Sequence, residues 1–222
     1  MRLACGHCRQ RGAEPGLQAP LGAVMEQWID TDELEETTSA LEMFAEVVGS
    51  LVAVRYRWRW AILALHAAVQ GFMVCALRGS NGLAVLRDDI AEEWLEAREK
   101  GLPFPEEKLD SFLNLYRKTK STRMIFYVHS RQFEPSGTQG SSIKRLNSLR
   151  NEFTHFLPRI WALEVSGLPC ICRDCVDFIE FLALQSGNIL WFREGQQERV
   201  GASLTAARQS LAEVERSYAR GL

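Results

Sequence analysis

Apolar residues recur three and four positions apart along most of the chain, which is the spacing of an amphipathic helix. The first such stretch follows Thr31 and Asp32, which can cap a helix, and it opens with an acidic turn that suits a helix N-terminus. A second stretch, 57–77, is apolar on nearly every side, which favours the centre of a helical bundle. The turn-forming segment 78–82 ends it. The apolar positions of the first stretch are Leu34, Leu41, Phe44, Val48 and Leu51.

Five more helices are predicted downstream, each bounded by glycine, proline or a capping serine. Segment 133–140 is the clearest loop, and 123–130 is compatible with either helix or strand. The chain has no internal repeat and no change of composition after residue 25, so we expect one all-α domain over 25–222. The expected helices are 83–100, one from Pro105 through Tyr116, one from Ser141 or Ser142 to near Pro158, 172–192 and 196–220.

The last predicted helix carries an apolar stripe with alternating spacings of three and four. Such a stripe can pack on the bundle or on a partner chain, and the sequence leaves both open. Its residues are Val200, Leu204, Ala207, Leu211, Val214 and Tyr218.

Composition excludes several classes of protein. The 222 residues include 26 Lys or Arg and 28 Asp or Glu, and the resulting net charge of -2 excludes a wholly basic nucleic-acid binder. The hydrophobic fraction of 46% argues against a disordered chain. Because no run of about 18 uninterrupted apolar residues occurs, we expect no membrane span. A membrane helix at 60–77 is the minority alternative.

Residues 1–24 differ from the rest of the chain. They hold four glycines and two prolines with no periodic apolar face, so we expect a disordered tail. They also lack the continuous apolar core of a signal peptide, which favours a cytoplasmic protein. A second hypothesis is that the native chain starts at Met25 and that the preceding residues come from a mis-called start.

Two C-x-x-C pairs among the six cysteines raise the question of a metal site. Cys5 and Cys8 lie in the tail, very far in sequence from Cys172 and Cys175. The second pair adjoins a helical pattern, where a free cysteine behaves as a small apolar residue. We therefore expect no metal and no cofactor, and reduced thiols in a cytoplasm.

Charge is unevenly distributed along the chain. Residues 25–54 include eight acidic side chains and no basic one, whereas 117–159 include nine basic and two acidic ones, a net +7. Solvated helix faces explain most charge runs. The functional alternative is an anionic partner, such as a nucleic-acid backbone, near the middle of the chain.

One motif that can carry chemistry lies inside this basic region. Arg150 and Asn151 are followed by His155, and on a helix Asn151 and His155 are i and i+4 and share a face. Arg150 lies about 100° around the helix from Asn151, so the three can line one broad polar groove. The apolar flank of Leu146, Leu149 and Phe153 can anchor the same helix to the core.

This segment resembles the R-x(4–6)-H motif of the HEPN superfamily in its R-N-x-x-x-H form, at Arg150, Asn151 and His155. A helical bundle with the motif in its later half strengthens the resemblance, whereas the additional C-terminal helix departs from a minimal HEPN domain. The resemblance implies a metal-independent endoribonuclease that forms a homodimer and leaves 2′,3′-cyclic phosphate ends. His155 would transfer the proton of the ribose 2′-hydroxyl, Arg150 would stabilise the phosphorane and Asn151 would orient them.

Other polar residues are assigned supporting roles. Lys144 and Arg145 precede the motif and are expected to bind substrate, as RNA is the expected partner. His66 and Gln70 are i and i+4 on the central helix, where a buried hydrogen-bonded pair is favoured over a role beside the motif. The run 55–60 interleaves arginines with aromatic residues, which can stack single-stranded nucleic acid but more often marks a helix start with snorkelling side chains.

Three functions from different classes remain open. The first is the ribonuclease, as a toxin or defence effector with an antitoxin or other protein partner. The second is a non-catalytic interaction protein, which would use the last helix and the acidic first helix as docking surfaces. In that case the Arg-Asn-His trio would be a capping and salt-bridge device, with Glu152 or Glu164 as its partner. The third is a nucleotide pocket centred on His66 and Gln70.

Overall fold

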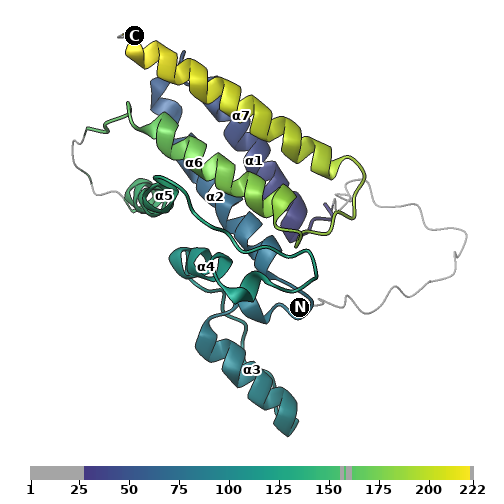
Figure 1. Ribbon diagram of the computed structural model, residues 1–222. Helices are drawn as coiled ribbons and strands as arrows, with labels where there is room; N and C mark the ends of the chain where they lie inside the picture. Colours follow the sequence, from purple (N-terminus) through teal and green to yellow (C-terminus); the bar gives the residue numbers. More distant parts are fainter. Residues whose placement is uncertain (1–27, 156–157, 159–161, 221–222) are drawn as a thin grey trace, which may run out of the picture. The chain divides into compact units, whose positions relative to one another are not determined.

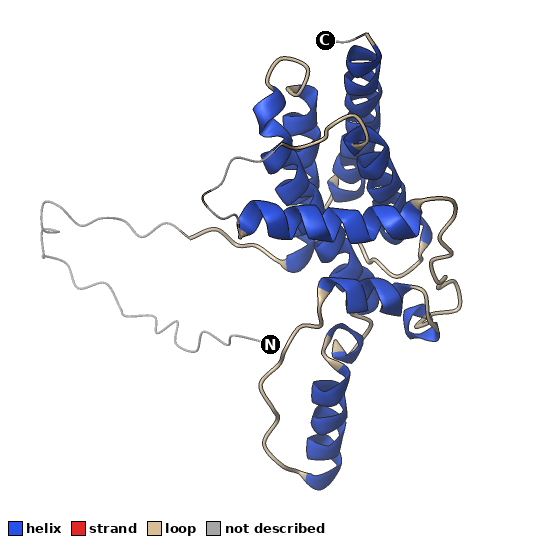
Figure 2. Cartoon of the chain, turned by 90° about the vertical axis from the view of Figure 1, so that its left-hand side faces the viewer, coloured by secondary structure: helices blue, strands red, loops and turns tan. Residues whose placement is uncertain are grey.

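The computed structural model describes residues 28–155, 158 and 162–220, and within these ranges every regular element is a helix (Figure 2). The predicted all-α fold is therefore confirmed. A π-helical turn, Phe181–Gln185, continues α6, and short 3₁₀ turns lie at Arg55–Arg57, Leu83–Val85 and Thr122–Met124. The α-helices are α1 (Glu33–Gly49), α2 (Trp58–Leu77), α3 (Asp88–Lys100), α4 (Phe112–Thr119), α5 (Gln139–Thr154), α6 (Leu168–Glu180) and α7 (Gln196–Ala219).

Helix α2 is the central element of the bundle. It packs against α1, α4, α5 and α6, and its core positions include Ile62, Leu65, Val69 and Phe72, all fully buried. Among the described residues, Arg55–Leu77 alone is long and apolar enough to cross a membrane, but 61% of its most apolar window is buried inside the protein. This packing is that of a core helix and is consistent with a soluble protein.

Helix α5 is seen end-on in Figure 1 and crosses the other helices of the bundle in Figure 2, and it packs against α6. Helices α1 and α7 pack against each other on the other side of α2 and α6. The apolar stripe of α7 faces inward, since Val200, Leu204, Ala207, Leu211 and Val214 are buried. The stripe therefore packs on the bundle and is not available to a partner chain.

The prediction that a helix begins at Pro105 is wrong. Residues 102–110 are non-helical, and the end of this segment pairs with the segment that precedes α3. The Asp110 N–H donates to the Val85 carbonyl at 2.9 Å. Pairing of Leu86 with Leu109 belongs to the same contact. Helix α4 begins only after Ser111, whose hydroxyl accepts from the Asn114 N–H. Tertiary pairing thus overrides the helix-start signal of the proline.

Two other predicted helices differ at their ends. The helix expected over 83–100 starts at Asp88, because 83–85 form a 3₁₀ turn. The helix expected over 172–192 begins at Leu168 and stops before Gly187, which has φ +74°. A Cβ at Gly187 would lie 2.6 Å from the His129 carbonyl oxygen, so this close approach requires glycine there. Segment 123–130, left open between helix and strand, contains the end of a 3₁₀ turn and then irregular backbone.

The second C-x-x-C pair belongs to the core. Cys172 and Cys175 are fully buried on α6, and burial raises the pKa of both thiols above the ordinary range. They therefore pack as small apolar residues, as predicted. Cys5 and Cys8, and the whole tail 1–24, lie outside the described residues. Within the described ranges, no group of three or more His, Cys, Asp and Glu side chains is arranged to hold a metal ion.

Candidate active site at the end of helix α5

The motif helix α5 is held to the core along the predicted apolar flank. Leu146 and Leu149 are fully buried and Phe153 is 5% exposed. At its other end, the hydroxyls of Thr138 and Ser142 donate to one carboxylate oxygen of Asp174 on α6, at 2.7 and 2.6 Å. Thr138 is the N-cap residue, so the expected cap at Ser141 or Ser142 is wrong. Both ends of α5 are thus fixed relative to its neighbours.

A hydrogen bond joins the middle of α5 to the central helix. His66 Nε2 on α2 lies 3.3 Å from Asn147 Oδ1 on α5, and the imidazole stacks on Phe112 with ring centroids 4.1 Å apart. Burial lowers the pKa of His66 to about 4, and the positive charge of Arg150 acts in the same direction. His66 is therefore a neutral, satisfied core histidine. Its hydrogen-bond partner is Asn147 and not the predicted Gln70.

Arg150 and Asn151 lie in the last turn of α5, and His155 directly follows the helix. The guanidinium of Arg150 donates to Asn151 Oδ1 at 3.0 Å, and the Thr154 hydroxyl donates to the Arg150 carbonyl at 2.8 Å. His155 is the C-cap, with φ -114° and ψ 41°, and its N–H donates to the Asn151 carbonyl at 2.9 Å. The helix therefore ends before His155 rather than near Pro158. Asn151 and His155 are exposed, and Arg150 is half-buried.

Arg150 reaches a groove that we call the motif groove, with a volume of about 590 Å³. Arg150, His66 and Gln70 line this groove together, whereas Asn151 and His155 do not line it. Helix α1 adds two carboxylates to the groove. Its lining residues are Glu33, Glu36, Thr37 and Ala40 of α1, Leu63, His66, Ala67, Gln70, Gly71 and Val74 of α2, and Arg150 and Thr154 of α5.

The two residues predicted to support substrate binding differ in their surroundings. Arg145 forms an ion pair with Glu152 at 2.9 Å. The Glu152 carboxylate also accepts a hydrogen bond from the Ser148 hydroxyl. Lys144 is exposed on the same helix. Glu152 therefore neutralises Arg145 along the helix surface, and Lys144 remains the simpler candidate for a phosphate contact.

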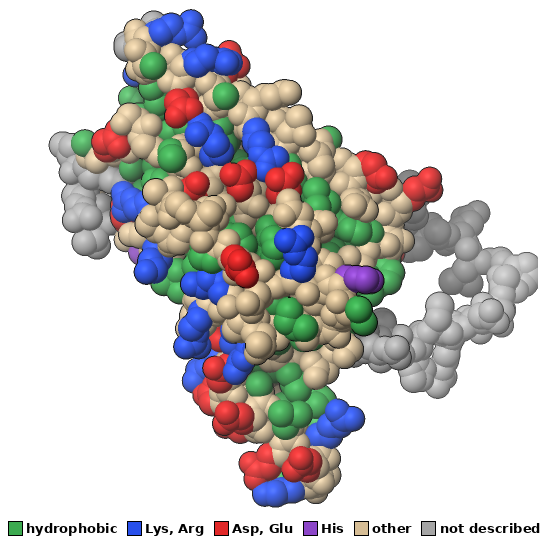
Figure 3. Space-filling model, viewed as in Figure 1, with side chains coloured by type: hydrophobic (Ala, Val, Ile, Leu, Met, Phe, Trp, Pro, Cys, Tyr) green, Lys and Arg blue, Asp and Glu red, His purple; other side chains and the backbone are tan. Residues whose placement is uncertain are grey.

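Three basic residues from the middle of the chain pair with carboxylates within the fold. Lys118 is buried between Asp88 and Asp110, while Arg117 and Arg123 also pair with Asp88. On the face seen in Figure 3, Lys and Arg side chains alternate with Asp and Glu over the lower elements. Part of the net charge of +7 over residues 117–159 is thus neutralised by ion pairs within the fold.

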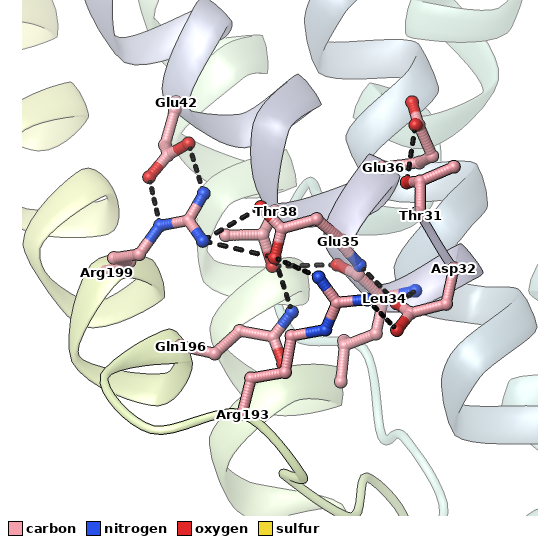
Figure 4. Close-up of polar contacts among 10 residues, drawn as sticks. All are labelled: Thr31, Asp32, Leu34, Glu35, Glu36, Thr38, Glu42, Arg193, Gln196 and Arg199. Carbon is pink, nitrogen blue, oxygen red and sulfur yellow. Dashed lines mark hydrogen bonds and ion pairs between the residues drawn. The ribbon is translucent and has the colours of Figure 1, made fainter. Parts of the chain in front are cut away.

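The acidic first helix is likewise partly neutralised within the chain (Figure 4). Arg199 of α7 faces Glu42 with two nitrogens, each 2.8 Å from a carboxylate oxygen, and also contacts Glu35 at 2.9 Å. These hydrogen bonds lower the pKa of Glu42. Arg193 reaches Asp32 at the start of α1 at 2.8 Å. The two helices predicted to dock a partner, α1 and α7, therefore pack against each other, and arginines of α7 and of the loop before it pair with the acidic side chains of α1.

Asn147 is the site residue that sequence reasoning missed. It lies four residues before Asn151, so the two side chains share one side of α5. This four-residue spacing is the sequence feature that could have identified Asn147. No local sequence pattern indicates that Glu33, Glu36 and Thr37 line the motif groove. Helices α1 and α5 are far apart in sequence, and only the tertiary structure places residues of both at one groove.

Comparison with family models, with curated proteins and with solved structures found no match to this chain. A function for this chain therefore rests on its own motif, groove and fold.

Proposed function

We propose that this chain is a metal-independent, HEPN-like endoribonuclease that acts in the cytoplasm as a homodimer. The observation that carries the proposal is the C-terminal end of α5, where half-buried Arg150 contacts exposed Asn151 and exposed His155 follows the helix. An arginine fork, an amide and an imidazole on one surface turn are the groups that phosphoryl transfer without a metal needs.

The proposed reaction uses the ribose 2′-hydroxyl of the RNA as its nucleophile. His155 accepts the proton of this hydroxyl, the 2′-oxygen forms a bond to phosphorus, and the bond from phosphorus to the 5′-oxygen breaks. A general acid then protonates the leaving 5′-oxygen. The products are a 2′,3′-cyclic phosphate and a 5′-hydroxyl, and Arg150 stabilises the charge that builds up on the phosphorane oxygens.

A second copy of the chain supplies the second proton-transferring group. His66 is the histidine that lines the motif groove, and its pKa of about 4 leaves it neutral at pH 7, so it does not serve as the general acid. His66 acts instead as a positioning residue, through its hydrogen bond to Asn147 on the motif helix. Two motif turns facing each other across a two-fold axis would bring two His155 side chains to one phosphate.

The proposed nuclease activity also requires an inhibitor in the cell. A nuclease that needs neither metal nor cofactor is active wherever RNA is present, so we propose a toxin or defence effector held by an antitoxin or another protein partner. Co-purification of the chain with that partner from cells that make both would support this part of the proposal.

The test compares the purified full chain with His155→Ala and Arg150→Ala in the presence of a metal chelator. Wild type is expected to produce RNA fragments with cyclic-phosphate and 5′-hydroxyl ends, and each variant to be slower by about 100-fold or more. His129→Ala is the matched control, because His129 is an exposed histidine outside the motif groove. Equal cleavage by wild type and His155→Ala, or loss of wild-type cleavage with chelator, would contradict the proposal.

A further inference from the structure

The aromatic and basic run 55–60 divides into an anchor and an exposed pair. Trp58 is 1% exposed, and its Nε1–H donates to the Tyr218 hydroxyl of α7 at 2.7 Å. Tyr56 and Trp60 are exposed instead, with 95% and 57% of their surface accessible. Two large aromatic side chains four residues apart therefore lie at the surface on a fixed helix start, where α7 ends (Figure 1).

Cations surround these two aromatic side chains. Arg55 and Arg57 are exposed beside Tyr56, and the guanidinium of Arg59 lies 5.3 Å from the centroid of the Trp60 ring. The guanidinium lies over the indole ring and brings positive charge close to it. Aromatic surface bordered by arginine is the combination that holds bases by stacking and phosphates by charge.

The adjoining groove, which we call the platform groove, has the charge that a polyanion requires. It has a volume of about 850 Å³, and the described residues that line it are two arginines and apolar or aromatic side chains, with no carboxylate among them. Three other grooves on the described part of the chain, the motif groove among them, each carry two or three carboxylates. The platform-groove residues are Val52, Ala53, Val54, Arg55, Tyr56, Trp58, Arg59, Phe153, Leu163 and Val165.

The platform groove adjoins the motif turn. Phe153 of α5 lines the platform groove, while Arg150 and Thr154 line the motif groove, so the last turn of α5 separates the two. On α2, Trp60 is three residues before Leu63 of the motif groove, which places both on one side of that helix. From Trp60 to Gln70 the helix rises about 15 Å, a distance that a few nucleotides can span.

We propose that Tyr56 and Trp60 form a stacking platform for single-stranded RNA, whose backbone passes Arg55 and Arg57 toward the motif turn. The inference rests on the proposed function in one respect, which is that the bound strand is the substrate cleaved at Arg150 and His155. Stacking on a base face requires an unpaired base, so the platform selects single strands over duplex.

The test measures binding of a fluorescent 12-nucleotide oligouridine to the full chain by anisotropy. Tyr56→Ala/Trp60→Ala is expected to weaken binding by about 30-fold or more, from the loss of two stacked bases. Arg55→Glu/Arg57→Glu is expected to weaken binding and to flatten its dependence on salt. A 12-base-pair RNA duplex is expected to compete poorly for wild type.

Matched controls keep the test independent of folding. Phe192→Ala removes an aromatic side chain that is 81% exposed and does not line the platform groove, and Arg98→Glu reverses an exposed charge on α3. Both are expected to bind RNA as wild type does, and all variants are compared only where thermal melting shows the wild-type transition. Wild-type affinity in the aromatic double variant, or equal affinity of wild type for duplex and single strand, would overturn the platform.

Failure of the platform and failure of the proposed function give different results. His155→Ala that binds oligouridine as wild type does, together with no cleavage by wild type, refutes the nuclease and leaves the platform standing. Cleavage by wild type, with unchanged binding and unchanged KM in Tyr56→Ala/Trp60→Ala, refutes the platform and leaves the nuclease standing.

Discussion

The Nζ of Lys118 lies 2.7 Å from Oδ2 of Asp110, and the two side chains are only 2% and 4% exposed. The same ammonium lies 2.9 Å from Asp88 at the start of α3 and donates to the Leu86 carbonyl. Although burial acts to raise it, hydrogen bonds from Lys118 and Asn114 lower the pKa of Asp110 below its ordinary value. This buried cluster attaches α3, which extends away from the other helices in both views, to α4 (Figures 1 and 2).

Lys118→Met is expected to lower the free energy of unfolding by about 3–5 kcal/mol, because it leaves the buried Asp110 carboxylate without its cation. Urea denaturation followed by circular dichroism measures the change. Asp89→Ala is the control, since Asp89 pairs with Arg87 at an exposed position and its loss should leave the midpoint unchanged. Equal midpoints for wild type and Lys118→Met would show that the cluster does not stabilise the fold.

Asn188 is a second buried polar anchor, 6% exposed after the end of α6. Its amide nitrogen donates to the Ala76 and Met124 carbonyls at 2.9 and 2.8 Å, and its oxygen accepts from the Ser130 hydroxyl at 2.6 Å. Asn188→Ala is expected to cost about 3 kcal/mol, because two buried carbonyls lose their donor. Asn81→Ala, which removes an exposed turn contact, should cost much less in the same urea titration. A small effect at Asn188 would mean that water replaces the amide.

Gly71 sets how closely α1 approaches α2 beneath the motif groove. A Cβ at Gly71 would lie 2.0 Å from Thr37 Oγ1 and 2.9 Å from Thr37 Cβ. Gly71→Ala is expected to destabilise the protein by about 1–3 kcal/mol from overpacking, despite the better helix propensity of alanine. Gly201→Ala in α7, where nothing lies within 4 Å of the new Cβ, should instead stabilise by up to about 1 kcal/mol. Thermal melting of both variants decides the matter, and a stabilised Gly71→Ala would refute the close approach.

His66 predicts a loss of stability in mild acid. Its pKa is about 4 in the folded chain, against an ordinary value of 6.5, so the unfolded chain binds the proton more tightly. The stabilisation is present above pH 6.5 and is lost as the pH falls through this window toward 4. Between pH 7 and pH 5 the free energy of unfolding should fall by about 2 kcal/mol from this group. Guanidinium titrations at the two pH values should show this fall in wild type and a smaller one in His66→Gln; an identical fall in both would assign it to other groups.

Local sequence patterns predicted the helices well where one face is apolar and the ends carry turn residues. The first two helices and the last begin and end within a few residues of the expected positions, because Asp32, Gly79 and Gly195 act on their immediate neighbours. The helix from Pro105 failed because backbone pairing between 85–87 and 108–110, distant in sequence, outweighed the local preference. Periodicity does not report such pairing.

The sequence by itself determined the all-α fold, the apolar flank of α5 and the motif of Arg150, Asn151 and His155. Tertiary structure decided which charges remain available, because ion pairs such as Lys118 with Asp88 form between segments that no spacing rule connects. It also decided the direction of each aromatic side chain in 55–60, since one helix face must be buried and the other cannot be. Side-chain periodicity is local and is written in the sequence, whereas burial and pairing depend on which helices the fold places side by side.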